Sequence, residues 1–179
     1  MATDFQAIEG LVTSRARVAD VKHRGGGRFV LGRCAGRRPV PFGRAVLVVP
    51  QAPPADFGET VVVAWKDGVE AVRAVTAAAP FLAKAKRICL ITVDEGDHED
   101  KSLAAMADYL TLVGLTVELS KIVPKSDTVG EALLLKAASK PGALLVMGAY
   151  GHWRWREWAF GGVTQHVLRN ATVPVLMAH

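Results

Sequence analysis

Short apolar runs and amphipathic stretches alternate along the second part of the chain. Apolar or β-branched runs bounded by turn residues are typical of buried strands, and the sequence has them at 60–65, 87–93, 116–123, 143–147 and 173–178. The stretches between them carry apolar residues every three or four positions, which is typical of helices that cover a sheet. This alternation predicts a doubly wound α/β fold, a five-stranded parallel sheet with helices on both faces.

Polar and turn residues mark where these helices begin and end. Asp67, with Glu70 three residues later, predicts a capping pair at the start of the first helix. Thr128 and Glu131 predict the same kind of start for the third helix. The predicted apolar face of the first helix consists of Val69, Val72 and Val75. The predicted ends of the second and third helices are Gly114 and Pro141–Gly142, and the last helix, 163–169, is short.

The strand at 116–123 differs from the other four, because polar Glu118 and Ser120 alternate there with apolar side chains. Such alternation suits an edge strand rather than a central one, and the first and fourth strands are hypothesised to be central neighbours. In doubly wound sheets a ligand sits beyond the carboxyl ends of the strands, where the strand order reverses. The loops at 66–68 and 148–151 are therefore expected to meet at a ligand site.

A glycine-flanked loop, GAYGHWRWREWAFGG, follows the fourth strand at 148–162. Glycine lets a backbone turn tightly or approach a ligand closely. These glycines therefore either form the tight turns at the ends of the loop or cradle a ligand. The loop lies at the predicted switch point, and the helix after Gly162 offers unpaired N–H groups to an anion. The pattern therefore favours a phosphate site, although it is neither a Walker loop nor a Gly-x-Gly-x-x-Gly motif.

Charge and cysteine content argue against several other classes of protein. The net charge of +5 arises in residues 1–43, which hold eight Lys or Arg against three Asp or Glu, while the rest of the chain is balanced. A Gly/Arg-rich lead segment of this kind is more typical of a poorly ordered arm than of a nucleic-acid site. No apolar run is long enough to span a bilayer, so no membrane association is expected. With only Cys34 and Cys89, a disulfide framework is not expected, and the cytoplasm is the predicted compartment.

Four motifs in residues 59–179 carry a family resemblance. They are VVVAWKDG at the first strand, Gly-x2-Gly-x9-Gly from Gly148 to Gly161, GGVTQHVL after it, and the closing VPVLMAH. In these motifs the segment resembles the universal stress protein family. The resemblance implies a Rossmann-like fold of the adenine nucleotide alpha hydrolase type, with the strand order 3-2-1-4-5. It also implies a site for ATP or another adenine nucleotide, with Mg²⁺ only alongside the nucleotide. The candidate nucleotide-binding residues are Lys66, Asp67, Val93, Gly148, Gly151, His152, Gly161, Gly162, Val163 and Thr164.

Two positions depart from the family's pattern. Members that bind ATP usually have Ser or Thr after the third glycine, where the hydroxyl donates to a phosphate, and this chain has Gly162 there. They also usually have an aspartate directly after the first strand, where this chain has Lys66. Asp67 stands one place later and is either a ligand residue or only a helix cap. The site is therefore expected to be degenerate, with weak or absent ATP binding.

No nucleophile–base pair and no paired acids converge at the predicted switch point, so no catalytic residue is assigned. The five histidines show no metal-ligand spacing. The leading interpretation is a non-enzymatic stress-response module that acts as a dimeric binding or regulatory protein, with its protein partner unknown. A nucleotide-independent interaction scaffold and a weak ATP hydrolase are the alternatives. The related nucleotidyl-transferring and pyrophosphatase enzymes need a His-x-Gly-His or Ser-Gly-Gly-x-Asp-Ser loop, which VVVAWKDGVEA lacks.

Residues 1–58 precede the predicted domain at 59–179. Within them AVLVVP (45–50) echoes the closing PVLMAH, and QAPPADFG has the composition of a linker. Tandem members of the family carry two domains, so residues 44–50 are interpreted as the last strand of a lost first domain, and residues 1–43 are assigned no function. The closing strand Val173–Ala178 is expected to leave an exposed edge. The resemblance implies a homodimer through this strand, with Ala45–Val49 as a candidate added strand.

Overall fold

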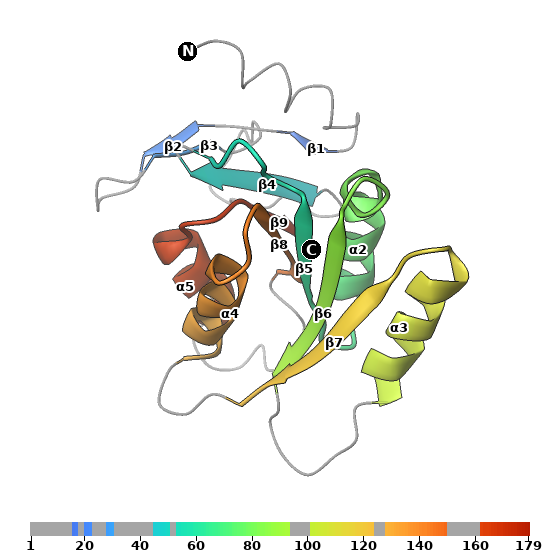
Figure 1. Cartoon of the computed structure of the whole chain (residues 1–179). Helices are drawn as coiled ribbons and strands as arrows, with labels where there is room; N and C mark the ends of the chain where they lie inside the picture. Colours follow the sequence, from blue (N-terminus) through green and yellow to red (C-terminus); the bar gives the residue numbers. More distant parts are fainter. Residues whose placement is uncertain are drawn as a thin grey trace.

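The structure is a computed structural model that describes residues 45–50, 53–93, 101–123, 128–149 and 162–179, together with the backbone of three short strands before residue 45. The five predicted strands are β5 (Thr60–Ala64), β6 (Arg87–Val93), β7 (Val117–Ile122), β8 (Ala143–Gly148) and β9 (Val175–Ala178). They run parallel in the order β7-β6-β5-β8-β9 (Figure 1). This confirms the expected order 3-2-1-4-5, with β7 at the edge.

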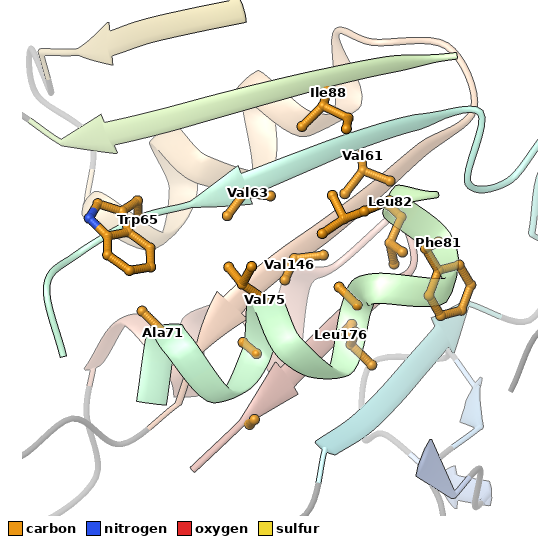
Figure 2. Packing of buried hydrophobic residues seen from close by; sticks show 14 of the residues in the cluster. Val61, Val63, Trp65, Ala71, Val75, Phe81, Leu82, Ile88, Val146 and Leu176 are labelled. Carbon is orange, nitrogen blue, oxygen red and sulfur yellow. The ribbon is translucent and has the colours of Figure 1, made fainter. Parts of the chain in front are cut away.

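Helices cover both faces of the sheet, as predicted. α2 (Val69–Leu82) and α3 (Lys101–Leu112) lie on one face, and α4 (Val129–Ala138) and α5 (Gly162–Asn170) lie on the other (Figure 1). Because side chains alternate along a strand, β5 contributes Val61 and Val63 to the core under α2 and Val62 to the core under α4 and α5. Figure 2 shows the first core, with Val75 and Phe81 of α2 directed at the strands.

The first helix presents a different face to the sheet from the one predicted. Val69 and Val72 are 59% and 48% exposed, so the predicted face was wrong for these two residues. The buried side chains of α2 are Ala71, Ala74, Val75, Ala78, Phe81 and Leu82. Alanines at this spacing let the helix backbone approach the sheet closely. The predicted Asp67–Glu70 capping pair is also wrong, because the N-cap is Gly68 and no side chain caps the helix there.

Two other helix ends were predicted correctly. The Thr128 side chain accepts a hydrogen bond from the Glu131 N–H at 3.3 Å and caps α4. Gly114 ends α3 with φ +85°, and the N–H of Leu115 donates to the Leu110 carbonyl at 3.0 Å. That 6→1 hydrogen bond is the Schellman pattern, which places a left-handed residue where glycine is favoured. None of the described helices combines the length and apolar character needed to cross a membrane.

A further strand lies beside the five. β4 (Ala45–Pro50) pairs antiparallel with β9, from Ala45 opposite Ala178 to Val48 opposite Val175. The short strands β1 (Ala16–Arg17) and β3 (Arg28–Val30) pair with β4, and β2 (Asp20–Lys22) pairs with β3. The strand expected at 44–50 is therefore present. The free edge expected at β9 is not, because β4 occupies it in the same chain.

The connector between β4 and β5 folds against the body of the protein. The carbonyl of Gly142, in the turn before β8, accepts hydrogen bonds from the N–H groups of Gly58 at 2.9 Å and Thr60 at 3.2 Å. The rings of Phe57 and Phe81 pack with their centres 5.8 Å apart. Gly142 has φ +60°, and a Cβ there would overlap the carbonyl oxygen of Asp56. The glycine of the Pro141–Gly142 turn is therefore required both by its backbone conformation and by this contact.

Candidate functional site

The candidate site lies at the carboxyl edge of the sheet, between β5 and β8, where the strand order reverses. The register places Ala64 of β5 opposite both Ile91 of β6 and Met147 of β8. The ends of these three strands therefore lie side by side, and they carry the candidate residues Lys66 and Asp67, Val93, and Gly148. Of the remaining candidates, Gly151, His152 and Gly161 lie outside the described residues.

The other three candidates form the first turn of α5. Gly162 is exposed, Val163 is partly buried against the core under α4 and α5, and Thr164 is buried. A Cβ built at Gly162 would have no heavy atom of the described residues within 4 Å beyond its own turn, so the described part of the chain leaves space there. α5 returns the chain from the end of β8 to the start of the parallel strand β9 and therefore begins at the carboxyl edge. The ends of β5 and β8 therefore meet at the switch point, and contact of these candidates with a ligand stays a prediction.

Gly148 has a packing role that the sequence did not reveal. A Cβ at this position would lie 2.9 Å from the backbone nitrogen of Ala71 and 3.0 Å from the Cβ of Glu70. Gly148 therefore lets the first turn of α2 lie directly against the end of β8. Only three described glycines have positive φ, and neither Gly148 nor Gly162 is among them. Contact of Gly148 with a ligand stays a prediction.

The same contact adds a charged residue to the site. Glu70 was identified in the sequence only as part of a capping pair, yet its Cβ lies beside Gly148. The carboxyl edge near β5 and β8 therefore carries Lys66 together with the two acidic residues Asp67 and Glu70. Negative charge near a phosphate disfavours its binding, and Oε2 of Glu70 would lie 3.2 Å from a Cβ at Gly68, at the start of α2. The first-turn position of Glu70 was the only signal in the sequence.

Trp65 and His179 fix the backbone on the two sides of the site. The sequence analysis did not identify either residue as part of the site. Trp65 is buried, and its indole Nε1–H donates to the hydroxyl of Ser102, in the first turn of α3, at 3.0 Å. On the other side, the Ala149 N–H donates to the Ala178 carbonyl at 2.8 Å, and Nδ1 of His179 lies 2.9 Å from the Ala149 carbonyl. These contacts fix the backbone directly before Lys66 and directly after Gly148. The only sequence signal for Trp65 was a large aromatic residue at the end of an apolar strand.

The α4 and α5 helices meet near this edge through His166. Its Nδ1 lies 3.5 Å from the hydroxyl of Thr128, the residue that caps α4. A Cβ at Gly130 would lie 3.0 Å from the Cβ of His166, so glycine allows the two helices to approach closely. No group of three or more His, Cys, Asp or Glu side chains that could hold a metal ion occurs in the described part of the chain.

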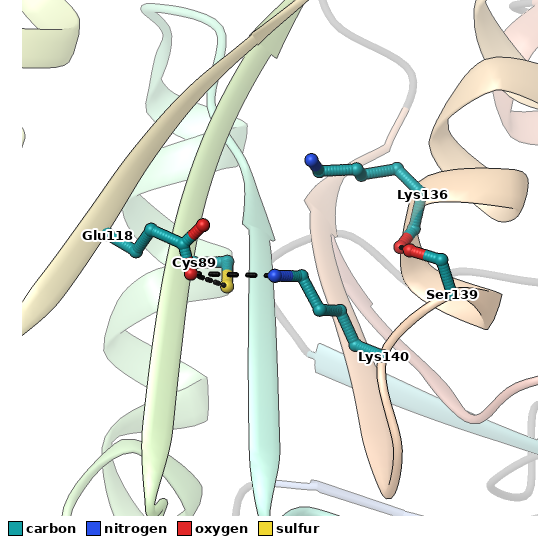
Figure 3. Close-up of polar contacts among 5 residues, drawn as sticks. All are labelled: Cys89, Glu118, Lys136, Ser139 and Lys140. Carbon is teal, nitrogen blue, oxygen red and sulfur yellow. Dashed lines mark hydrogen bonds and ion pairs between the residues drawn. The ribbon is translucent and has the colours of Figure 1, made fainter.

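A second polar cluster lies under the C-terminal end of α4, on β6 and β7 (Figure 3). The Cys89 thiol, buried in the core, donates to Oε2 of Glu118 at 3.4 Å, and Nζ of Lys140 lies 3.4 Å from the same oxygen. Burial raises the pKa of the Cys89 thiol above its ordinary value, and the hydrogen bond to Glu118 raises it further. Hydrogen bonding from Cys89, and then the charge of Lys140, lower the pKa of Glu118. Cys89 is therefore a protonated core thiol.

This cluster is expected to make stability depend on pH in two directions. The raised pKa of Cys89 gives a contribution that is complete below the unfolded value of 9.0 and is lost as pH rises through the folded pKa. The lowered pKa of Glu118 gives a contribution that is present above the unfolded value of 4.5 and is lost as pH falls. Urea midpoints measured from pH 3 to 10.5 should therefore lose part of their alkaline decline in Cys89→Ala and part of their acid decline in Glu118→Gln. An alkaline decline unchanged by Cys89→Ala would contradict the assignment.

Comparison with known proteins agrees with the fold. Residues 58–179 match the model described as the Universal stress protein family. Among solved structures, the chain is similar to a universal stress protein from Archaeoglobus fulgidus DSM 4304, with 22% identity and a TM-score of 0.57 over 69% of this chain. It is also similar to a putative universal stress protein from Pseudomonas aeruginosa UCBPP-PA14, with 16% identity and a TM-score of 0.50 over 65% of this chain. The matches span 46% and 42% of those two proteins. Comparison with curated proteins found no significant match.

Proposed function

The chain belongs to the universal stress protein family, and from this premise we propose that it is a non-enzymatic binding protein of the stress response with a weakened adenine-nucleotide site. The nucleotide would lie at the carboxyl edge, with its phosphates against the first turn of α5. The residues proposed to contact it are the candidates Lys66, Asp67, Val93, Gly148, Gly151, His152, Gly161, Gly162, Val163 and Thr164. Its compartment is proposed to be the cytoplasm, on cysteine usage alone.

The observation that carries this proposal is the open first turn of α5 at Gly162. A helix start offers backbone N–H groups and a positive dipole end to a phosphate, and the space around Gly162 leaves room for one. What the position lacks is a hydroxyl donor. Lys66 also stands where members that bind ATP usually have an aspartate. The backbone therefore suits a nucleotide, while the side chains hold it weakly.

Calorimetric titration with Mg-ATP tests the proposal. The unaltered chain is expected to bind with a Kd of about tens of micromolar or weaker, that is about −6 kcal/mol. Gly162→Ser combined with Lys66→Asp should tighten binding at least tenfold, about 1.4 kcal/mol. The serine hydroxyl adds a hydrogen bond to a charged phosphate, which contributes about 1.5–3 kcal/mol, and the aspartate restores the residue that ATP-binding members of the family usually have directly after the first strand, away from the phosphates. Serine fits at 162 because a Cβ there meets no neighbouring atom.

The matched control is Lys84→Asp, which makes the same charge change near the other end of α2. It should leave the affinity for Mg-ATP unchanged. Nanomolar binding by the unaltered chain, or no change in the double variant, would show that the interpretation of the α5 start is wrong. If neither protein binds any adenine nucleotide, the nucleotide-independent scaffold becomes the better proposal. Release of ADP from ATP by the purified chain would instead favour the weak hydrolase.

We also propose that the chain acts as a homodimer through the closing strand, Val173–Ala178. The support is the pairing of β4 with β9, which demonstrates that this edge accepts an apolar antiparallel strand over four residue pairs. Light scattering at micromolar concentration should give twice the mass of the chain. A monomeric mass would contradict this part of the proposal.

A further inference from the structure

The edge of β9 that a homodimer would use is already paired with β4 of the same chain. A second copy can use this edge in two ways: β4 can leave and stay unpaired, or the two copies can exchange their β4 strands. We infer that the dimer forms by exchange, so that β4 of each copy pairs with β9 of the other. This inference rests on the dimer proposed above and specifies the strand that joins the two copies.

Burial argues against the departure of β4 without exchange. Five consecutive apolar residues of β4 are buried, Ala45, Val46, Leu47, Val48 and Val49. Leu47 belongs to the core under α2, and Val48 belongs to the core under α4 and α5. Without exchange, the departed β4 would hold its apolar side chains in water, and the second copy would have to cover both cores anew. Exchange keeps every one of these contacts, because the same residues meet across two copies, and it is therefore the less costly route to a dimer.

The short strands that precede β4 are attached to the sheet through it. β1 and β3 pair with β4, and β2 pairs with β3, so these short strands join the sheet through β4. Beyond it, Phe57 packs on Phe81, and the Gly58 N–H donates to the Gly142 carbonyl, which ties the connector to the body. A change of direction must therefore fall between Pro50 and Phe57.

The composition of this connector suits such a hinge. Pro50, Pro53 and Pro54 lie within it. Proline has no N–H to donate, and it biases the residue before it towards an extended conformation. The side chains that β4 and β9 present to each other also do not favour pairing within one copy over pairing between two copies. The opposed pairs are all apolar, and they include Val46 with Met177 and Leu47 with Leu176. β4 of a second copy can therefore form the same residue pairs with β9 as β4 of the same chain does.

An engineered disulfide distinguishes pairing within a chain from exchange. Leu47→Cys with Leu176→Cys places two thiols on directly opposite residues, in a full-length chain that also carries Cys34→Ala and Cys89→Ala. After oxidation at micromolar concentration, electrophoresis in denaturant without reductant reports which chains are joined. Exchange predicts a covalent dimer as the main product. The two single-cysteine variants are matched controls and should run as monomers.

The mass of the native sample, measured by light scattering, separates the possible failures. A dimeric mass with the disulfide inside single chains would overturn exchange and leave the proposed dimer standing. A monomeric mass would overturn both. A second pair, Val46→Cys with Met177→Cys, covers the case in which the first variant does not fold or oxidise, because adjacent pairs in an antiparallel ladder differ in geometry. If neither pair forms a disulfide, β4 does not pair with β9 and the inference is wrong.

Discussion

Replacing Gly142 by alanine is expected to lower the free energy of unfolding by about 3 kcal/mol. The residue has φ +60°, a left-handed conformation that costs an L-residue roughly 1–2 kcal/mol. The new methyl group would also overlap the carbonyl oxygen of Asp56, with the carboxylate Oδ2 at 2.9 Å, and overpacking costs about 1–3 kcal/mol. The turn cannot simply retreat, because its carbonyl accepts hydrogen bonds from Gly58 and Thr60.

Gly114→Ala is the matched control for this substitution. Gly114 also has positive φ, +85°, but a Cβ there would meet no heavy atom within 4 Å. Only the backbone cost remains, so we expect a loss of about 1 kcal/mol. Urea unfolding followed by circular dichroism compares the two variants. Equal losses would mean that the contact with Asp56 contributes nothing.

Leu47→Ala is expected to destabilise the protein by a similar amount, about 3 kcal/mol, within the range of 2–5 kcal/mol usual for a buried leucine. Leu47 is 0% exposed and packs in the core under α2, although it lies outside the residues that match the family. The substitution therefore tests whether β4 is an integral part of the core. Urea unfolding measures the loss.

The control is Leu112→Ala, at the end of α3, where the side chain is 86% exposed. Its effect should stay within about 0.5 kcal/mol. A loss below about 1 kcal/mol for Leu47→Ala, comparable to that of the control, would show that β4 is not packed as described. Circular dichroism of both folded variants should match the unaltered chain, which confirms that the comparison concerns stability alone.

The strands could be predicted because their signals are local, whereas their order was implied by the family resemblance. The runs at 60–65 and 143–147 are apolar throughout, and both become central strands, whereas the polar alternation around Glu118 marks an edge. The face of α2 could not be predicted in the same way. Valine is more apolar than alanine, so Val69 and Val72 were predicted to lie on the buried face. Close packing against β8 instead requires the smaller alanines.

The site was predictable in position and less so in its detail. The strand order that the family resemblance implied brings the ends of β5 and β8 together, which located Lys66, Asp67 and Gly148. The packing of Gly148 against Ala71 joins residues far apart in the chain, and no local pattern records such a contact. The same holds for β4: its apolar sequence predicted a strand, but only the register with β9 shows that it fills that edge.

The pairing of β4 with β9 also sets an order of events during synthesis. The two strands are about 130 residues apart in the chain, and a ribosome adds about 5–20 residues per second. AVLVVP therefore emerges roughly 7–26 s before the strand that it will cover. Throughout that interval β1 and β3 are available to pair with this apolar, β-branched segment but β9 is not, and an apolar strand edge left open in this way favours aggregation. β9, the last strand to leave the ribosome, thus covers the edge of β4, the first strand of the core to be synthesised.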